Sequence, residues 1–338
     1  MFQRILVPLD GSARAERALP VAANLANARN ATLVLLRVVP DLLDVGGYMI
    51  PAVATDTGAT EREEFEARDY LSAIAKTHPL HGVRVEQVVG FGVPAQVILD
   101  TIKSSGIDAI IIGSHGRTGL SRWVMGSIAQ AVVRHSSAPV LLLRQQGPSL
   151  DDVDGHGRPF RILVPLDGSE LAEAALGPAQ IMGEAFAPSG VYELHVARVI
   201  PFLNTASPDA LRDTARAEAT AELNRVAQRL NALTNGKAKV TTSVITEIDV
   251  ADALARMTRS GELVTGSLIS DGCDLIAMAT HGRTGLARLA IGSVTERVLS
   301  ATVAPALIIR PERMKLEAQP TGARVNSAKP EETWSALF

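Results

Sequence analysis

The chain alternates short apolar runs with segments in which apolar residues recur at helical spacing. Five segments have the length and pattern of strands: residues 5–9, 32–39, 83–89, 107–112 and 140–143. Four segments between them carry apolar side chains every three or four positions: residues 13–28, 60–76, 93–103 and 126–135. Strands and helices that alternate in this way predict a parallel sheet with helices on both faces.

Three motifs occur twice in the same order. R-I-L-V-P-L-D-G-S begins at Arg4 and again at Arg161. A glycine-rich string reads G-S-H-G-R-T-G-L-S-R-W-V-M-G-S from Gly113 and A-T-H-G-R-T-G-L-A-R-L-A-I-G-S from Ala279. Each is followed by a closing strand, A-P-V-L-L-L-R or A-P-A-L-I-I-R. We therefore predict two α/β domains, residues 1–144 and 160–311, each built on a five-stranded parallel sheet.

The remaining segments separate or extend these domains. Residues 145–159 are rich in Gly, Asp and Pro and are typical of a linker, and the polar residues 312–338 predict a disordered tail. The second copy is longer than the first, with the extra residues near 261–269. Residues 41–59 have no counterpart of matching length, and two interpretations stay open: a cover over a site or interface, or a surface loop.

Composition narrows the class of protein. The 338 residues are 46% hydrophobic and 20% charged, enough for two packed cores, and the net charge of −3 argues against a duplex-binding protein while leaving a local basic groove open. The chain has one cysteine, Cys273, which we expect to be a core residue in a reducing compartment. With no signal-peptide pattern and no long apolar stretch, we expect a soluble cytoplasmic protein that binds neither membrane nor nucleic acid.

Candidate binding residues follow the strands. Asp10 follows the first strand, Val38 and Val39 end the second, and Gly113 follows the fourth. Ligands of parallel α/β sheets bind outside the carboxyl ends of the strands, so these residues predict one crevice. A carboxylate there can accept hydrogen bonds from a ribose. Asp10-Gly-Ser12 is equally typical of a tight turn that caps a helix, and this interpretation stays open.

The glycine-rich segment adds a phosphate-binding geometry. It connects a strand to a helix, and Gly126-Ser127 would place unpaired N–H groups and a hydroxyl at the helix N-terminus, where anions bind. The alternative is that the glycines serve only the turns. Neither His115 nor His281 has neighbours at metal-ligand spacing, so we expect loop contacts and no metal held by side chains.

The loop arginines and the missing catalytic motifs limit the chemistry. Four arginines could close on phosphates or face solvent: Arg117, Arg122, Arg283 and Arg288. The sequence contains no Gly-x-Ser-x-Gly motif, no Gly-Lys-Ser/Thr phosphate loop and no cysteine–histidine pair. Dedicated hydrolytic machinery is therefore not expected.

Both halves of the chain resemble the universal stress protein family. The resemblance rests on the G-x2-G-x9-G-S spacing, the V-P-L-D-G-S at the first strand and the A-P-V-L-L-L-R at the last, each in register twice. It implies a Rossmann-like, adenine nucleotide alpha hydrolase-like fold that binds ATP, with any Mg²⁺ held by the phosphates. The residues implied in the first half are Pro8, Leu9, Asp10, Val38, Gly113, His115, Gly116, Gly126, Ser127 and Ile128. Those implied in the second half are Asp167, Val199, His281, Gly282, Gly292, Ser293 and Val294.

The second copy departs from this pattern at Ala279, which replaces Gly113. The added Cβ could obstruct a ligand, or strain the backbone if that position needs a positive φ; with ordinary dihedrals it is harmless. We therefore expect the first half to bind ATP and the second to bind it more weakly or not at all. The closing strands resemble sheet edges, and we expect them to pair within the chain as a pseudo-dimer, with a homodimer as a further option.

Three functions are compared on these grounds. The first is an ATP-binding stress-response protein that signals nucleotide state, with at most slow ATP hydrolysis. The second is a member of the same family that binds protein partners and no nucleotide. The third is an adenylating or pyrophosphate-releasing enzyme, which would need a longer serine–glycine loop than Asp10-Gly-Ser12 provides. The first is the function that we expect.

Overall fold

The computed structural model of the chain describes both halves. The described residues are 1–40, 57–114, 125–144, 150, 158–187, 190–201, 209–259, 263–264, 267–268, 272–280 and 291–311. Five of the segments discussed above fall wholly or largely outside them: residues 41–56, 115–124, 281–290, most of 145–159, and 312–338.

The first half has the predicted order of elements. Its strands are β1 (Arg4–Leu9), β2 (Thr32–Val39), β3 (Arg84–Phe91), β4 (Ala109–Gly113) and β5 (Val140–Leu143). Its helices are α1 (Ala13–Glu16), α2 (Ala18–Arg29), α3 (Thr57–Ala75), the short 3₁₀ helix η1 (His78–Leu80), α4 (Pro94–Ser104) and α5 (Ser127–His135). This order confirms the predicted α/β class.

The second half repeats the first. Its strands are β6 (Phe160–Pro165), β7 (Tyr192–Pro201), β8 (Ala238–Glu247), β9 (Leu263–Val264), β10 (Ser267–Leu268), β11 (Leu275–Ala279) and β12 (Ala306–Ile309). Its helices are α6 (Glu170–Glu173), α7 (Leu176–Phe186), α8 (Asp209–Thr234), α9 (Val250–Arg259) and α10 (Ser293–Ala301). The small antiparallel pair β9–β10 occupies the segment in which the sequence placed the extra residues.

Ten strands form one continuous sheet in the order β3-β2-β1-β4-β5-β12-β11-β6-β7-β8. Within each half the described strands of this sheet pair in parallel. The closing strands β5 and β12 pair antiparallel, with Leu141 opposite Leu307. The two halves therefore meet at an antiparallel pair of strands.

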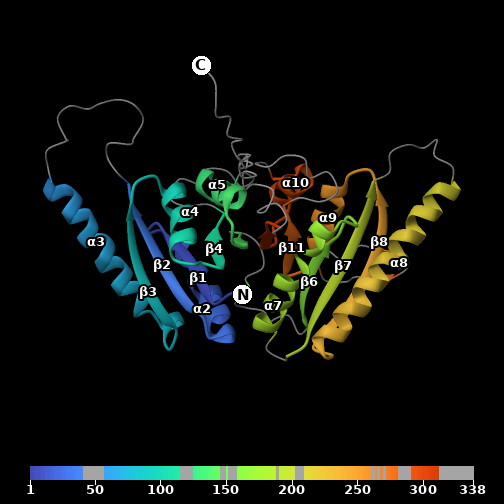
Figure 1. Cartoon of the computed structure of the whole chain (residues 1–338), viewed down its shortest axis with the longest axis horizontal. Coiled ribbons are helices and arrows are strands. Elements are labelled where there is room, and N and C mark those ends of the chain that lie inside the picture. Colours follow the sequence, from blue (N-terminus) through green and yellow to red (C-terminus); the bar gives the residue numbers. More distant parts are fainter. Residues whose placement is uncertain are drawn as a thin grey trace, which may run out of the picture.

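Helices cover both faces of this sheet (Figure 1). One hydrophobic core gathers buried residues of α2, α3, α7 and α8 with the strands, and α2 packs against α7. A second core gathers residues of α4, α5, α9 and α10 on the other face. Among the described residues, two ion pairs connect the halves, Arg29 with Glu184 and Arg134 with Glu296, each at 3.8 Å. No helix of the described residues has the length and apolar character that a membrane span requires.

The segment predicted as one helix over residues 13–28 is two helices, α1 and α2. Arg17 separates them and caps α1. Pro20, the third residue of α2, has no N–H to donate to the carbonyl of Glu16, so the helical ladder is interrupted there. Pro178 holds the same place in α7 of the second half. The prediction of a single helix was wrong at this point.

Candidate functional site

A cavity of about 300 Å³ opens at the carboxyl ends of β1, β2 and β4. It brings together residues that the sequence predicted from separate segments. Eight of them line it: Pro8, Leu9, Asp10, Val38, Gly113, Gly126, Ser127 and Ile128. The other two, His115 and Gly116, lie outside the described residues. The proximity of the eight is an observation, and their role in binding stays a prediction.

The turn after β1 fixes the orientation of Asp10. Its Oδ1 accepts hydrogen bonds from the backbone N–H of Ser12 at 3.0 Å and from the Ser12 hydroxyl at 2.6 Å. Ser12 Oγ accepts from the N–H of Ala15 at 3.2 Å and caps α1. Gly11 has a φ of 80°, in the left-handed region that favours glycine. The turn-and-cap interpretation is therefore correct, and the same turn places a carboxylate in the cavity lining.

The N-terminus of α5 forms another part of the wall. Gly126 precedes the helix and gives it no side-chain cap, and its N–H donates to the carbonyl of Ser114 at 2.8 Å. The N–H groups of Ser127, Ile128 and Ala129 belong to the first turn, where the helix itself supplies no acceptors. Since these residues line the cavity, the positive end of the helix dipole lies there and favours an anion.

Arg37 is a cavity residue that the sequence pattern did not single out. It lies on β2, and its Nη1 donates to the carbonyl of Leu9 at 3.4 Å. Its guanidinium carbon lies 5.5 Å from the centroid of the Tyr70 ring, a cation–π distance. Tyr70 donates its hydroxyl to Glu16 at 2.9 Å, and burial raises the pKa of this phenol, which stays neutral. The available signal was an arginine at the same place in two largely apolar strands, L-V-L-L-R-V-V and L-H-V-A-R-V-I.

The second half has a cavity of about 570 Å³ at the corresponding strand ends. Its Asp167 accepts from the backbone N–H and the hydroxyl of Ser169 at 3.0 and 2.6 Å, as Asp10 does in the first half. His281 and Gly282 lie outside the described residues. Five predicted residues line this cavity: Asp167, Val199, Gly292, Ser293 and Val294.

Ala279 is an ordinary strand residue that lines the second cavity. It is the last residue of β11 and pairs with Ile309 of β12. Among the described residues, the non-glycine positions with positive φ are Phe2, Asn30 and Asn235. Of the alternatives left open for Ala279, backbone strain is therefore excluded. Its methyl group adds bulk to the wall without straining the chain.

A carboxylate neutralises the arginine of the second cavity. Arg198 lies on β7 beside Val199, and its Nη1 donates to Glu222 of α8 at 2.6 Å. Glu222 and Glu218 both line this cavity. The two cavities therefore share an arginine and differ in its partner.

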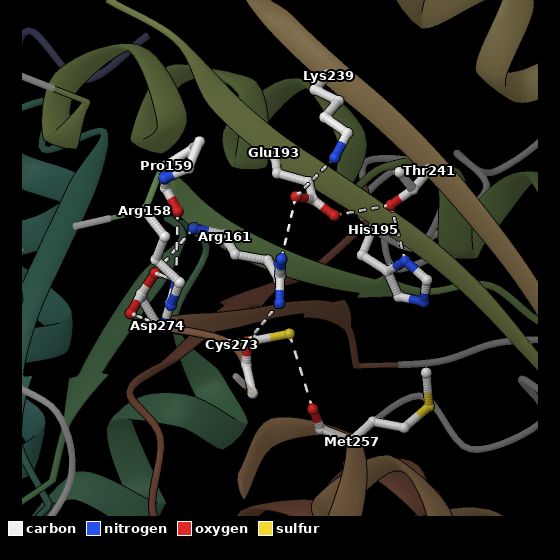
Figure 2. Close-up of polar contacts among 11 residues, drawn as sticks. Arg158, Pro159, Arg161, Glu193, His195, Lys239, Thr241, Met257, Cys273 and Asp274 are labelled. Carbon is white, nitrogen blue, oxygen red and sulfur yellow. Dashed lines mark hydrogen bonds and ion pairs between the residues drawn. The ribbon is translucent and has the colours of Figure 1, made fainter. Parts of the chain in front are cut away.

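A polar network in the second half lies at the opposite ends of the strands (Figure 2). Asp274, which precedes β11, is 2% exposed and accepts from the backbone N–H of Arg161 at 2.8 Å. It also accepts from both terminal nitrogens of Arg158, at 2.8 and 2.9 Å. Arg161 donates to Glu193 at 3.2 Å. These residues connect the amino ends of β6, β7 and β11 and do not line the cavity.

His195 extends this network into the core, as Figure 2 shows. The ring is 3% exposed, with Nδ1 2.9 Å from Thr241 Oγ1 and Nε2 2.8 Å from Ser243 Oγ. Thr241 donates its single hydroxyl hydrogen to Glu193 at 3.1 Å, so it accepts from His195, which places the ring proton on Nδ1. Burial lowers the pKa of His195 to about 4. The imidazole is therefore neutral at pH 7.

Cys273 is a core residue, as the sequence predicted. It is 4% exposed, its thiol lies 3.8 Å from the carbonyl oxygen of Met257, and burial raises its pKa to about 12. A thiol with this pKa carries almost no thiolate at pH 7 and is a poor nucleophile. Among the described residues, no three His, Cys, Asp or Glu side chains cluster in a way that could hold a metal ion.

Comparison with known proteins identifies the family. The model of the universal stress protein family matches residues 1–144 and 160–310. The chain belongs to the universal stress protein family. Because the match occurs twice, this is a tandem universal stress protein. A universal stress protein of Mycolicibacterium smegmatis is 24% identical over 315 residues, 91% of this chain and 97% of its own. One of Methanocaldococcus jannaschii is 27% identical over 157 residues, 43% of this chain and 97% of its own.

Solved structures of universal stress proteins have the same fold. One from Archaeoglobus fulgidus superposes with a TM-score of 0.64 at 19% identity and covers 92% of this chain and 99% of its own. One from Pseudomonas aeruginosa has a TM-score of 0.58 at 17% identity, covering 94% of this chain and 96% of its own. At these identities the likeness concerns the fold alone.

Proposed function

We propose that the first half of this tandem universal stress protein binds ATP and that the protein reports nucleotide state through a change of shape or of partner. The observation that carries the proposal is the convergence of three separated segments on one cavity. The turn after β1, the end of β2 and the start of α5 all line it. Each segment offers what one part of an adenine nucleotide needs.

The chemistry of these segments suits adenine, ribose and phosphate in turn. The backbone at Val38, the residue before the last of β2, offers polar groups for the adenine edge. The Asp10 carboxylate can accept hydrogen bonds from ribose hydroxyls. The first-turn N–H groups of α5 and the Ser127 hydroxyl can donate to phosphates. The volume of about 300 Å³ lies at the lower end of ordinary ligand pockets.

We propose binding without efficient turnover. Among the described residues of the first cavity, the ionisable side chains are Asp10 and Arg37. Asp10 is bonded to the Ser12 hydroxyl and N–H, and an arginine does not act as a base. Any hydrolysis of ATP is then slow, and any Mg²⁺ is held by the phosphates of the nucleotide.

The pairing of β5 with β12 supports a pseudo-dimer within one chain. The hydrogen-bonding edges of both closing strands face each other, so each edge is covered by the other half. We propose that the two halves act as a pair that needs no second chain to complete the sheet. A partner-binding protein without nucleotide is the competing function.

Calorimetric titration of the full chain with ATP tests the proposal. Asp10→Asn keeps an oxygen that can accept from the Ser12 N–H and removes the carboxylate charge. We expect it to weaken ATP binding while the protein stays folded by circular dichroism. Asp69→Asn is the matched control, because Asp69 is exposed on α3 and does not line the cavity.

Thermal unfolding gives a second readout of the same proposal. ATP at 100 times its dissociation constant should stabilise the binding half by about 2.7 kcal/mol. If ATP gave no heat of binding in the titration and did not change the melting temperature, the partner-binding function would be favoured. Many turnovers per minute in a product assay would instead favour an enzyme.

A further inference from the structure

The two cavities hold the same arginine against different neighbours. Arg37 and Arg198 occupy corresponding places. Arg37 pairs with Leu9 at the end of β1, and Arg198 directly follows Ala197, which pairs with Pro165 at the end of β6. Each arginine comes just before the valine of its cavity. Each guanidinium also lies over the glycine of the Asp-Gly turn, where an added Cβ would meet it. The arginine is therefore a built part of both cavities.

The helix that packs beside each arginine supplies the difference. In α3, Ala67 and Leu71 are buried, and Tyr70 lies between them in the sequence. In α8 the same spacing is filled by the buried residues Ala219 and Leu223, with Glu222 between them. Glu222 thus corresponds to Tyr70.

These two residues have opposite effects on the arginine. The Arg37 guanidinium carbon lies 5.5 Å from the centroid of the Tyr70 ring, and this neutral ring places no negative charge against the arginine. The Tyr70 hydroxyl donates to Glu16. Glu222 instead accepts from Arg198 at 2.6 Å, with the two side chains 25% and 14% exposed. A carboxylate in direct contact with the guanidinium cancels its attraction for an anion.

The formal charges of the two linings differ accordingly. The described lining of the first cavity carries one acid, Asp10, and one base, Arg37, and is neutral. The described lining of the second carries one base and three acids, giving a net charge of −2: Arg198, Asp167, Glu218 and Glu222. The glycine-rich strings that begin at Gly113 and Ala279 have the same number of charged residues, two arginines each.

We propose that Tyr70 and Glu222 set the charge selectivity of the two cavities, so that the first takes a nucleoside triphosphate and the second takes an adenine ligand with at most one phosphate. The adenine part of this inference rests on the proposed function. The charge part rests on the arginine and its partner. A negatively charged lining repels a triphosphate with about four negative charges much more than a neutral nucleoside, whereas the methyl group of Ala279 acts on both ligands alike.

The test titrates the full chain with adenosine, AMP and ATP. Asp10→Asn weakens binding in the first cavity, so that the second dominates the titration, and Asp167→Asn does the reverse. We expect the second cavity to bind adenosine or AMP at least about tenfold more tightly than ATP, and the first to show the reverse order. If both cavities ranked adenosine, AMP and ATP in the same order of affinity, the inference would be overturned.

Substitutions at Glu222 and Tyr70 make the test specific to the residue beside each arginine. In the chain that carries Asp10→Asn, Glu222→Gln keeps the shape and removes the charge, and we expect ATP binding to rise about tenfold while adenosine binding changes less than about threefold. Tyr70→Glu in the chain that carries Asp167→Asn should lower ATP binding and leave adenosine binding nearly unchanged. Asp213→Asn, on the exposed side of α8, is the control.

The outcomes separate this inference from the proposed function. Adenosine binding in the second cavity, with no ATP binding in the first, would overturn the proposed function and the part of the inference that concerns the first cavity, and would keep the selectivity of the second. Equal effects of Glu222→Gln on ATP and adenosine would overturn the selectivity and keep the proposed function. No binding of any of the three ligands in either cavity would overturn both.

Discussion

Acid should destabilise the second half of the chain through one buried imidazole, that of His195. The ring is 3% exposed, and burial lowers its pKa from 6.5 to about 4. In the unfolded chain the imidazole takes up a proton as the pH falls below about 6.5, whereas the folded chain resists it until about pH 4. The unfolded state therefore binds more protons in this window, and stability falls as the pH falls.

The size of this effect follows from the difference between the two pKa values. The shift of the His195 pKa from 6.5 to about 4 corresponds to about 3 kcal/mol in the free energy of unfolding, since one pKa unit corresponds to about 1.4 kcal/mol. The loss begins near pH 6.5 and is complete near pH 4. Nearly neutral conditions should therefore show the second half at its full stability.

His195→Val removes this titration and uses the residue of the first half at the same place. Val34 lies opposite Leu6 as His195 lies opposite Leu163. The variant loses two hydrogen bonds and should be less stable at pH 7, but its stability should fall about 3 kcal/mol less than that of the unchanged chain between pH 7 and pH 4. His81→Ala, at an exposed position, should keep the full dependence on pH.

Hydrogen exchange of peptides from β7 and β8, measured from pH 7 to pH 4 and corrected for the intrinsic exchange rate, reports the second half alone. Peptides from β2 and β3 serve as an internal reference. If His195→Val retained the whole pH dependence in β7, the imidazole would not be its source. The reasoning from burial would then be refuted.

Three further substitutions test other parts of the structure. Asp274→Ala should lower the free energy of unfolding, measured in urea, by about 3–5 kcal/mol, because it leaves the largely buried Arg158 without its carboxylate. Asp108→Ala, at the more exposed corresponding place, should lower it less, and equal losses would contradict this. Gly168→Ala should cost about 1–3 kcal/mol, since the residue has a φ of 86° and lies under an arginine, and an unchanged melting temperature would argue against that conformation. Gly113→Ala should weaken ATP binding to the first half by roughly tenfold in calorimetry, and unchanged affinity would remove bulk at this position as a cause of asymmetry.

The sequence predicted the layout of the fold because its signals are local. The apolar runs at 32–39 and 140–143 match β2 and β5 in both bounds. The repeated motifs predicted where binding residues lie, since the carboxyl ends of parallel strands meet at one edge. The break between α1 and α2 was missed although Pro20 signals it, because the apolar spacing continues across it.

Contacts between distant segments could not be predicted in the same way. Arg37 meets Tyr70 only when α3 packs on the sheet, and no local pattern links positions so far apart. His195 meets Thr241 and Ser243 from the neighbouring strand, so its environment depends on the register of β7 with β8. A polar residue in an apolar strand indicates that a hydrogen-bond partner is present, but the sequence does not show which residue that partner is.

The antiparallel pairing of β5 with β12 joins two complete cavities to one sheet. Each cavity lies at the carboxyl ends of the strands of its own half, and these ends of β2 and β7 lie on the same side of the molecule in Figure 1. The occupancy of one half can reach the other through the shared strands and the helix pair α2–α7. A tandem chain of this kind can therefore present two different ligand states to a single partner that covers that side.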